Sequence, residues 1–173
     1  MKQARRHDDI LAAARALVTD AGYSATTMEA IAARAGVGKP TLYRWWPNRA
    51  ALVHEALVAD LAAAPVTDLR GFVAGVLGFF DRPLVRRAWL GAVAELADDP
   101  AALAAAHQAF LRPAARELQA VLAGSAADAR LVLDVVIGAG IAGLVVPGAR
   151  RSRASRIDAL TALLTAATDT ARP

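Results

Sequence analysis

Residues 39–45 carry side chains of the types that contact nucleic acids. Two cations, a hydroxyl, a phenol and an indole are combined in this short segment. They are Lys39, Arg44, Thr41, Tyr43 and Trp45. Cations and hydrogen-bond donors of these types anchor phosphate oxygens and reach the edges of bases. The segment therefore predicts a nucleic-acid-binding surface.

The charge around this segment is positive. No acidic residue lies between Glu29 and Glu55, whereas four cations fall in that interval. They are Arg34, Lys39, Arg44 and Arg49. A local field of this sign attracts phosphate backbones, although a solvated basic face is the alternative interpretation. A second basic cluster, in residues 150–156, is expected to serve mainly solubility.

A glycine turn between two short helices is expected to position the segment. The first helix begins near Thr26, which forms a capping-box pattern with Glu29. That helix ends at Gly36, and the second covers residues 39–45 because the residue before Pro47 resists the helical conformation. This arrangement predicts a helix-turn-helix, whose second helix enters the major groove of DNA.

The rest of the chain is also expected to be helical. Alanine, the strongest helix former, is abundant, and strand-like runs are few. An amphipathic helix is predicted before the helix-turn-helix, and another, capped by Asn48, follows it. The predicted ranges outside the motif are 7–21, 49–63, 68–80, 83–97, 100–122, 127–146 and 155–168. The fold class is therefore all-α, with an N-terminal three-helix domain in residues 1–50 and a helical domain in residues 51–173.

Two stretches in the first third of the chain resemble the tetracycline-repressor (TetR) family of regulators. One runs from Thr26 to Ala32, with the sequence TTMEAIA, and the other from Ala35 to Leu52, with the sequence AGVGKPTLYRWWPNRAAL. The resemblance implies a dimeric repressor that binds a palindromic operator in double-stranded DNA. It also implies that an unknown small-molecule effector releases the operator, with activation as the alternative outcome.

The resemblance also implies roles for individual residues. Thr27 and Arg49 would bind phosphates, and Tyr43 and Trp45 would pack against the DNA backbone or hydrogen-bond to it. The family often has histidine at the position of Trp45.

Base contacts are implied for the start of the second helix of the motif. Lys39 and Pro40 lie where base edges are read, and Met28 stands where some members place a base-reading arginine. The complete set of candidate DNA-binding residues is Thr27, Met28, Lys39, Pro40, Thr41, Tyr43, Arg44, Trp45 and Arg49.

The resemblance assigns effector binding and dimerisation to residues 51–173. The last two predicted helices would pair with those of a second copy, and the first of them is apolar nearly all round, which requires burial on most sides. Candidate interface residues are Leu131, Val135, Gly138, Ile141, Ala142, Val145, Leu160, Leu163 and Leu164. Candidate effector-cavity residues are Phe72, Phe79, Trp89, Glu95, His107 and Phe110, although residues of these types, taken singly, more often belong to ordinary core or surface.

Several other classes of protein fit less well. The chain has no cysteine, which excludes disulfides and thiolate metal sites, and its three histidines lack metal-ligand spacing. No cofactor, metal or catalytic residue is expected, so the protein is predicted not to be an enzyme. The longest apolar stretch, residues 135–149, is shorter than the ~20 residues of a membrane span. We therefore expect a cytoplasmic protein.

Two alternatives to a regulator remain at this point. Residues 138–143, with the sequence GAGIAG, match the glycine spacing of a dinucleotide-binding turn, which would indicate an oxidoreductase. Pro147 follows too soon for the helix that such a turn requires, and only 30 residues remain after Gly143. The second alternative is an architectural DNA-binding protein without an effector, which would not need so large a helical body.

Overall fold

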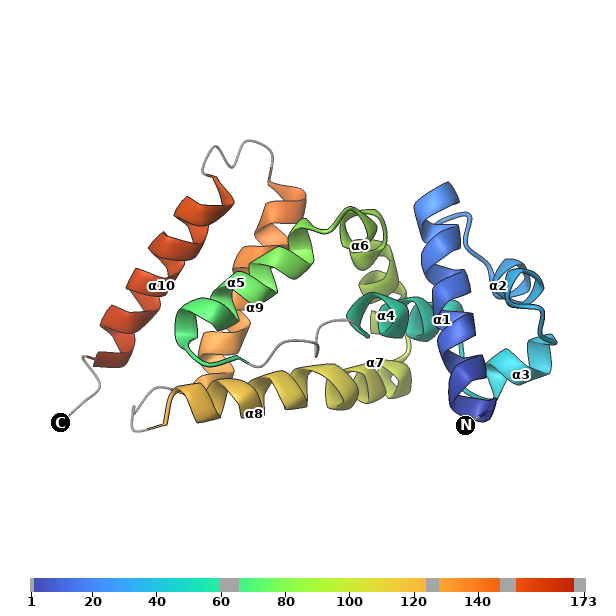
Figure 1. Cartoon of the computed structure of the whole chain (residues 1–173), viewed down its shortest axis with the longest axis horizontal. Coiled ribbons are helices and arrows are strands. Elements are labelled where there is room, and N and C mark those ends of the chain that lie inside the picture. Colours follow the sequence, from blue (N-terminus) through green and yellow to red (C-terminus); the bar gives the residue numbers. More distant parts are fainter. Residues whose placement is uncertain (1, 60–65, 124–127, 147–151, 170–173) are drawn as a thin grey trace. The chain divides into compact units, whose positions relative to one another are not determined.

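The computed structural model describes residues 2–59, 66–123, 128–146 and 152–169, and these residues form helices and connecting turns without any strand (Figure 1). By internal contacts the chain divides into two compact units. Unit 1 comprises Met1–Asp60 and Pro83–Ala109, and unit 2 comprises Leu61–Arg82 and Phe110–Pro173. No helix within the described ranges has the length and apolarity that crossing a bilayer demands.

Unit 1 contains the predicted helix-turn-helix and two later helices. Its elements are α1 (Lys2–Ala21), α2 (Met28–Ala35), α3 (Lys39–Tyr43), α4 (Arg49–Val58), α6 (Pro83–Ala97) and α7 (Pro100–Ala106). Unit 2 is built from α5 (Leu69–Asp81), α8 (Arg112–Val121), α9 (Ala129–Val145) and α10 (Arg153–Asp169). The units are therefore interleaved along the chain, and neither ends at residue 50. A functional boundary at that residue stays a prediction.

The predicted helices are found in the described residues, with two differences: α3 ends at Tyr43 and not at residue 45, and one helix of the C-terminal part is interrupted. The segment predicted as one helix over 100–122 contains a π-helical turn at His107–Leu111. Pro113 follows in the first turn of α8 and cannot donate a backbone hydrogen bond, so a local widening of the helix accommodates it. The predicted end of the fourth helix, near residue 63, lies outside the described residues.

The start of α2 corrects one local prediction. The helix is capped by Thr27, whose Oγ1 accepts a hydrogen bond from Ala30 N at 3.1 Å. Thr26 is fully buried instead, and its hydroxyl donates to the carbonyl of Gly22 at 2.8 Å. Because the end of α1 satisfies Thr26, the cap moves one residue along the chain. Gly36 ends α2 with φ of +65°, in the left-handed region that glycine adopts without strain.

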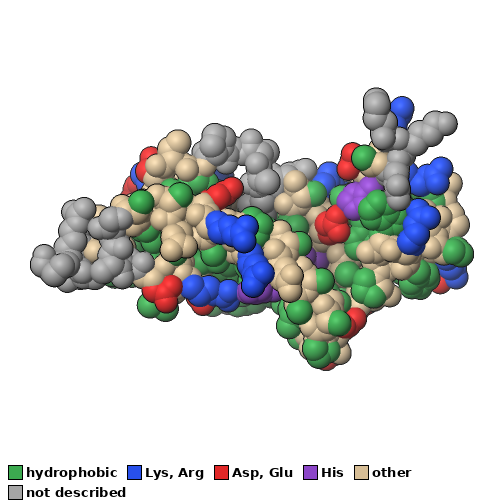
Figure 2. Space-filling view, turned by 90° about the horizontal axis from the view of Figure 1, so that it is seen from below, with side chains coloured by type: hydrophobic (Ala, Val, Ile, Leu, Met, Phe, Trp, Pro, Cys, Tyr) green, Lys and Arg blue, Asp and Glu red, His purple; other side chains and the backbone are tan. Residues whose placement is uncertain are grey.

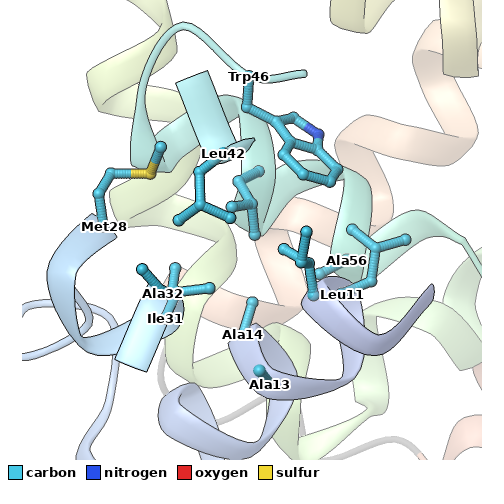
Figure 3. Close-up of a cluster of buried hydrophobic side chains, with 11 residues drawn as sticks. Leu11, Ala13, Ala14, Met28, Ile31, Ala32, Leu42, Trp46 and Ala56 are labelled. Carbon is cyan, nitrogen blue, oxygen red and sulfur yellow. The ribbon is translucent and has the colours of Figure 1, made fainter. Parts of the chain in front are cut away.

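The core of unit 1 holds α3 rigidly against α1, α2 and α4. Figure 3 shows Leu42 of α3 and the neighbouring Trp46 among buried side chains of these helices. Leu42 is completely buried and Trp46 is 3% exposed. The other large members of this cluster are Ile10, Leu11, Met28, Ile31 and Leu52. Because this core is closely packed, the backbone of α3 is held in a fixed position.

Unit 2 is organised around α5, which packs against both α9 and α10. Gly140 of α9 allows a close approach, because a Cβ atom there would lie 2.6 Å from Cε2 of Phe80. Residues 138–143 belong to the continuous helix α9 and not to a strand-to-helix turn. This finding contradicts the dinucleotide-binding alternative, since that site needs glycines in a loop at the start of a helix.

Candidate nucleic-acid interface

The outer face of α3 and of the residues that follow it is exposed. Tyr43 is 52% exposed and Trp45 is 37% exposed, whereas Leu42, on the side of α3 that faces the core, is not exposed at all. Lys39, Pro40 and Arg44 are also exposed, and Thr41 is half-buried. In Figure 2, Lys and Arg side chains lie next to hydrophobic ones at the end of the molecule that carries α1 and α3.

Two cations of the helix-turn-helix pair with carboxylates of unit 1. Lys39 Nζ lies 2.6 Å from Glu29 Oε1, so the start of α3 is bridged to the first turn of α2. The hydrogen bond that Lys39 donates to Glu29 raises the pKa of Lys39, and the same bond lowers the pKa of Glu29. Arg34 donates to Asp20 at 2.7 Å. Exposed pairs such as these contribute little to stability, so Lys39 can exchange Glu29 for a phosphate or a base at small cost.

Met28 does not reach the surface, which corrects its prediction as a base-reading residue. Its side chain is 6% exposed and packs in the same core cluster as Ile31 and Ala32. The three residues share one face of α2 because they are three and four positions apart. Thr27, by contrast, is exposed at the N-terminal end of α2, where backbone N–H groups and the helix dipole favour anions.

Arg49 is held against unit 1 by several hydrogen bonds, and its side chain is 29% exposed. Its Nε and Nη2 atoms donate to Glu95 Oε2 at 2.9 and 2.8 Å, and Nη1 donates to the carbonyl of Thr26 at 3.1 Å. The guanidinium also lies 4.6 Å from the centre of the Tyr23 ring. A phosphate contact by Arg49, as predicted from the sequence, would have to compete with these partners.

Glu95 accepts a third hydrogen bond at the same oxygen, from the Tyr23 hydroxyl at 2.9 Å. Burial, followed by this hydrogen bond, raises the pKa of Tyr23. Burial alone would raise the pKa of Glu95 as well, but the hydrogen bonds from Arg49 and Tyr23 outweigh it and lower that pKa. Glu95 is therefore ionised, and its charge ties α6 to α4 and to the turn between α1 and α2.

One face of α6, continued by the N-cap residue of α7, makes all of these connections. Arg87, Gly91 and Glu95 are four residues apart on α6, and Asp99, which caps α7, follows at the same interval. Arg87 donates to the carbonyl of Thr19, and Asp99 accepts from Asn48 Nδ2 at 3.0 Å. A Cβ atom at Gly91 would lie 2.5 Å from the Tyr23 ring, so glycine lets the tyrosine approach. We call these four residues the α6 docking face. Sequence reasoning missed it, although the four-residue spacing was visible.

The structure divides the six predicted effector residues between the two units. Phe72 and Phe79 are buried in unit 2, where the rings of Phe79 and Phe110 lie 6.2 Å apart. Trp89, Glu95 and His107 belong to unit 1. Trp89 is buried beside the ring of His54 at 5.2 Å, and Glu95 is part of the α6 docking face.

Unit 2 carries an open groove of about 600 Å³ between α9 and α10, to which α5 contributes one lining residue. It is lined by Leu77, Ala139, Ala142, Gly143, Val146, Arg156, Ala159, Leu160 and Leu163. None of the six predicted effector residues lines this groove. Their role in binding an effector stays a prediction.

The predicted dimer residues are mostly accessible in unit 2. Leu131, Val135 and Val145 are 62%, 40% and 52% exposed, and Gly138 and Ala142 are exposed between them. These five residues recur at intervals of four and three, so they form one stripe along α9. We call them the α9 stripe.

The remaining predicted interface residues differ in exposure. On α10, Leu163 is 63% exposed and Leu160 is half-buried, as is Ile141 on α9. Leu164 is 5% exposed because it packs in the core of its own unit, which corrects its prediction as an interface residue.

A helix-turn-helix whose second helix and following residues expose cations and aromatic rings is typical of DNA-binding transcriptional regulators. Residues 10–56 match the family described as "Bacterial regulatory proteins, tetR family". Through this N-terminal segment the chain is similar to TetR-family transcriptional regulators, which are not enzymes.

Individual relatives agree with this assignment. The uncharacterized HTH-type transcriptional regulator YdeS of Bacillus subtilis is 40% identical over 63 residues, which are 36% of this chain and 32% of that protein. The HTH-type transcriptional repressor KstR of Mycobacterium tuberculosis is 36% identical over 77 residues, which are 44% of this chain and 35% of KstR. The matched segment thus spans about a third of the length of these curated relatives.

Similarity to solved structures extends over nearly the whole chain. A TetR transcriptional regulator from Rhodococcus sp. RHA1 has a TM-score of 0.69 and 26% identity, with 95% of this chain and 97% of that chain covered. Salmonella enterica GusR, with a TM-score of 0.63 and 16% identity over 95% of this chain and 96% of its own, shares the fold. The all-helical fold predicted from the sequence is therefore confirmed.

Proposed function

We propose that this protein is a dimeric repressor that binds a palindromic DNA operator through α3 and releases it when a small molecule binds. The observation that carries the proposal is the contrast across α3. Leu42 is completely buried, while Tyr43 and Trp45 on the other side are 52% and 37% exposed next to exposed cations. A rigid helix with donors and aromatic rings on its free side suits the major groove. The name of KstR, a transcriptional repressor, supports repression as the outcome.

Contacts with bases are assigned to the start of α3, and contacts with phosphates to its end. Lys39 and Pro40 would face base edges, and Tyr43, Arg44 and Trp45 would contact the backbone. Thr27 would add a phosphate contact at the N-terminus of α2. We assign Arg49 a supporting role in place of a phosphate contact, because its guanidinium is already bound by Glu95 and by the carbonyl of Thr26.

Dimerisation is proposed through the α9 stripe together with Leu163 of α10. An exposed apolar stripe of this kind favours burial against a partner, and a second copy of the chain would supply an equivalent stripe. Pairing would separate the two α3 helices by about one turn of DNA, ~34 Å, and so select a palindrome. An effector would act by binding one arrangement of the dimer more tightly than the other. The cytoplasmic location stays a prediction.

DNA binding is tested by selecting bound sites from random duplexes and measuring affinity for the recovered site at several salt concentrations. Arg44→Ala is expected to weaken binding to every sequence and to reduce the salt slope by about one unit, because a phosphate contact is lost. Lys39→Ala should change the preference at particular base pairs. A wild-type protein without salt-sensitive affinity for any duplex would refute the proposal.

Dimerisation is tested with Leu163→Glu, which places a charge in the proposed interface. This variant should be monomeric in light scattering at concentrations where the wild type is a dimer. Leu103→Glu provides the matched control, because Leu103 is 41% exposed on α7 and lies outside the α9 stripe. If both variants remain dimeric, the copies associate through another surface.

A further inference from the structure

We propose that His7 is a positioning residue for DNA binding, which holds the exposed indole of Trp45 in the orientation that meets the DNA backbone. The inference rests on the proposed DNA contact of Trp45 and adds a residue of α1 to the binding machinery. His7 lies outside the segment that resembles the family motif, and it belongs to neither the predicted DNA-binding set nor the α6 docking face.

Trp45 needs such support because it lies beyond the end of α3. The helix ends at Tyr43, and Pro47 lies two residues after Trp45. The backbone N–H groups of Trp45 and Trp46 both donate to the carbonyl of Leu42, at 2.9 Å each. The backbone there is a turn, so side-chain contacts must restrict the Trp45 rotamer. Its neighbour Trp46 is anchored in the core, but Trp45 is 37% exposed.

The imidazole of His7 supplies these contacts. Its ring centre lies 4.8 Å from that of Trp45, and 4.9 Å from that of Trp46 in a stacked geometry with 30° between the planes. The two indole centres are 6.1 Å apart. His7 therefore bridges the buried indole and the exposed one. Offset and tilted ring pairs at these separations attract each other beyond simple burial.

Glu55 of α4 fixes the orientation of the bridging ring. One carboxylate oxygen lies 2.9 Å from His7 Nε2, and the other accepts a hydrogen bond from Trp46 Nε1 at 2.7 Å. Asp8 Oδ1 lies 3.8 Å from Nδ1 on the other side of the ring. Three elements thus meet here: α1 through His7, the segment after α3 through the two tryptophans, and α4 through Glu55. The ring cannot turn without losing a hydrogen bond or a stacking contact.

The test compares three replacements of His7 by their affinity for the duplex recovered by selection. His7→Ala removes the ring and the hydrogen bond, His7→Gln retains a donor for Glu55, and His7→Phe retains a ring. We expect Ala and Gln to weaken binding by about 3- to 10-fold, the range of an aromatic pair, and Phe to remain within about 2-fold of the wild type. Gln108→Ala, an exposed neutral position in unit 1, is the matched control for nonspecific effects.

A double-mutant cycle separates positioning from general stability. In the Trp45→Ala background, His7→Ala should produce no further loss, because the ring that it positions is absent. Urea unfolding of each variant shows whether the fold is retained. The proposal is overturned if His7→Gln binds like the wild type, or if the His7 and Trp45 losses simply add. A wild-type protein that binds no duplex would instead refute the proposed function, so the two failures are distinguishable.

Discussion

Replacing Gly140 of α9 by alanine tests the packing of unit 2 quantitatively. A Cβ atom at this position would overlap Cδ2 of Phe80 and would lie 2.6 Å from Cε2 and 2.9 Å from Cγ of the same ring. Phe80 is 4% exposed, so its ring has little space into which it could move. Forcing an extra methyl group into such a core costs about 1–3 kcal/mol.

Alanine would at the same time favour the helix. In a helix interior it is about 1 kcal/mol more favourable than glycine. Because the overlap involves several ring atoms, we expect its steric cost to exceed the gain in helix propensity. The net destabilisation should be about 1–2 kcal/mol. For a chain of this size, each kcal/mol of destabilisation lowers Tm by about 2–4 °C.

The assay is urea unfolding followed by far-UV circular dichroism, with a matched glycine as the control. Gly75 of α5 is also helical, and a Cβ atom there would meet no atom within 4 Å. Gly75→Ala should therefore stabilise the protein by about 0.5–1 kcal/mol. Phe80→Leu should partly rescue Gly140→Ala, because the two residues are in contact. The reasoning is refuted if Gly140→Ala stabilises the protein as much as Gly75→Ala does.

Three further predictions concern unit 1. Burial lowers the pKa of His54 to about 4, so the unfolded state binds its proton first as the pH falls. The free energy of unfolding is therefore highest above about pH 6.5 and falls by at most about 3 kcal/mol toward pH 4, because protonation of His54 favours the unfolded state. In His54→Gln, the free energy of unfolding in urea should depend less on pH over this window. Glu95→Gln should destabilise the protein by about 1 kcal/mol in the same assay, since charge-assisted hydrogen bonds to Arg49 are weakened; unchanged unfolding would argue against the network. A fragment of residues 2–59 should show less helix and lower urea resistance than the whole chain, because it lacks α6 and α7; full helicity would contradict an integral role for α6.

Local patterns were sufficient to predict most helices. The apolar periodicity of α1 and the cap of α4 depend on residues within one or two turns of each other. Asn48 accepts from Ala51 N, as expected for a cap. Where a local pattern was ambiguous, tertiary contacts decided the outcome. Either Thr26 or Thr27 could cap α2, and the buried hydrogen bond from Thr26 to Gly22 selects Thr27.

The candidate DNA-binding site was predictable only in part. The exposed residues of α3 followed from their types and from the turn before them. Met28 was assigned to the surface from the resemblance, but its spacing to Ile31 places it on the buried face of α2. Arg49 was assigned to phosphate binding, yet its partner Glu95 is 46 residues away in the chain, and no local pattern could pair them.

The order of residues alone determined an all-helical fold class, a glycine turn between two short helices, and the cations and aromatic rings of residues 39–45. These features depend on backbone preferences and on side chains a few positions apart. The folded chain decided which side chains the core would bury, how α6 would hold the helix-turn-helix through Glu95, and how His7 would come to lie beside Trp45. Such contacts join residues separated by tens of positions, and only the packing of complete helices brings their atoms within a few ångströms.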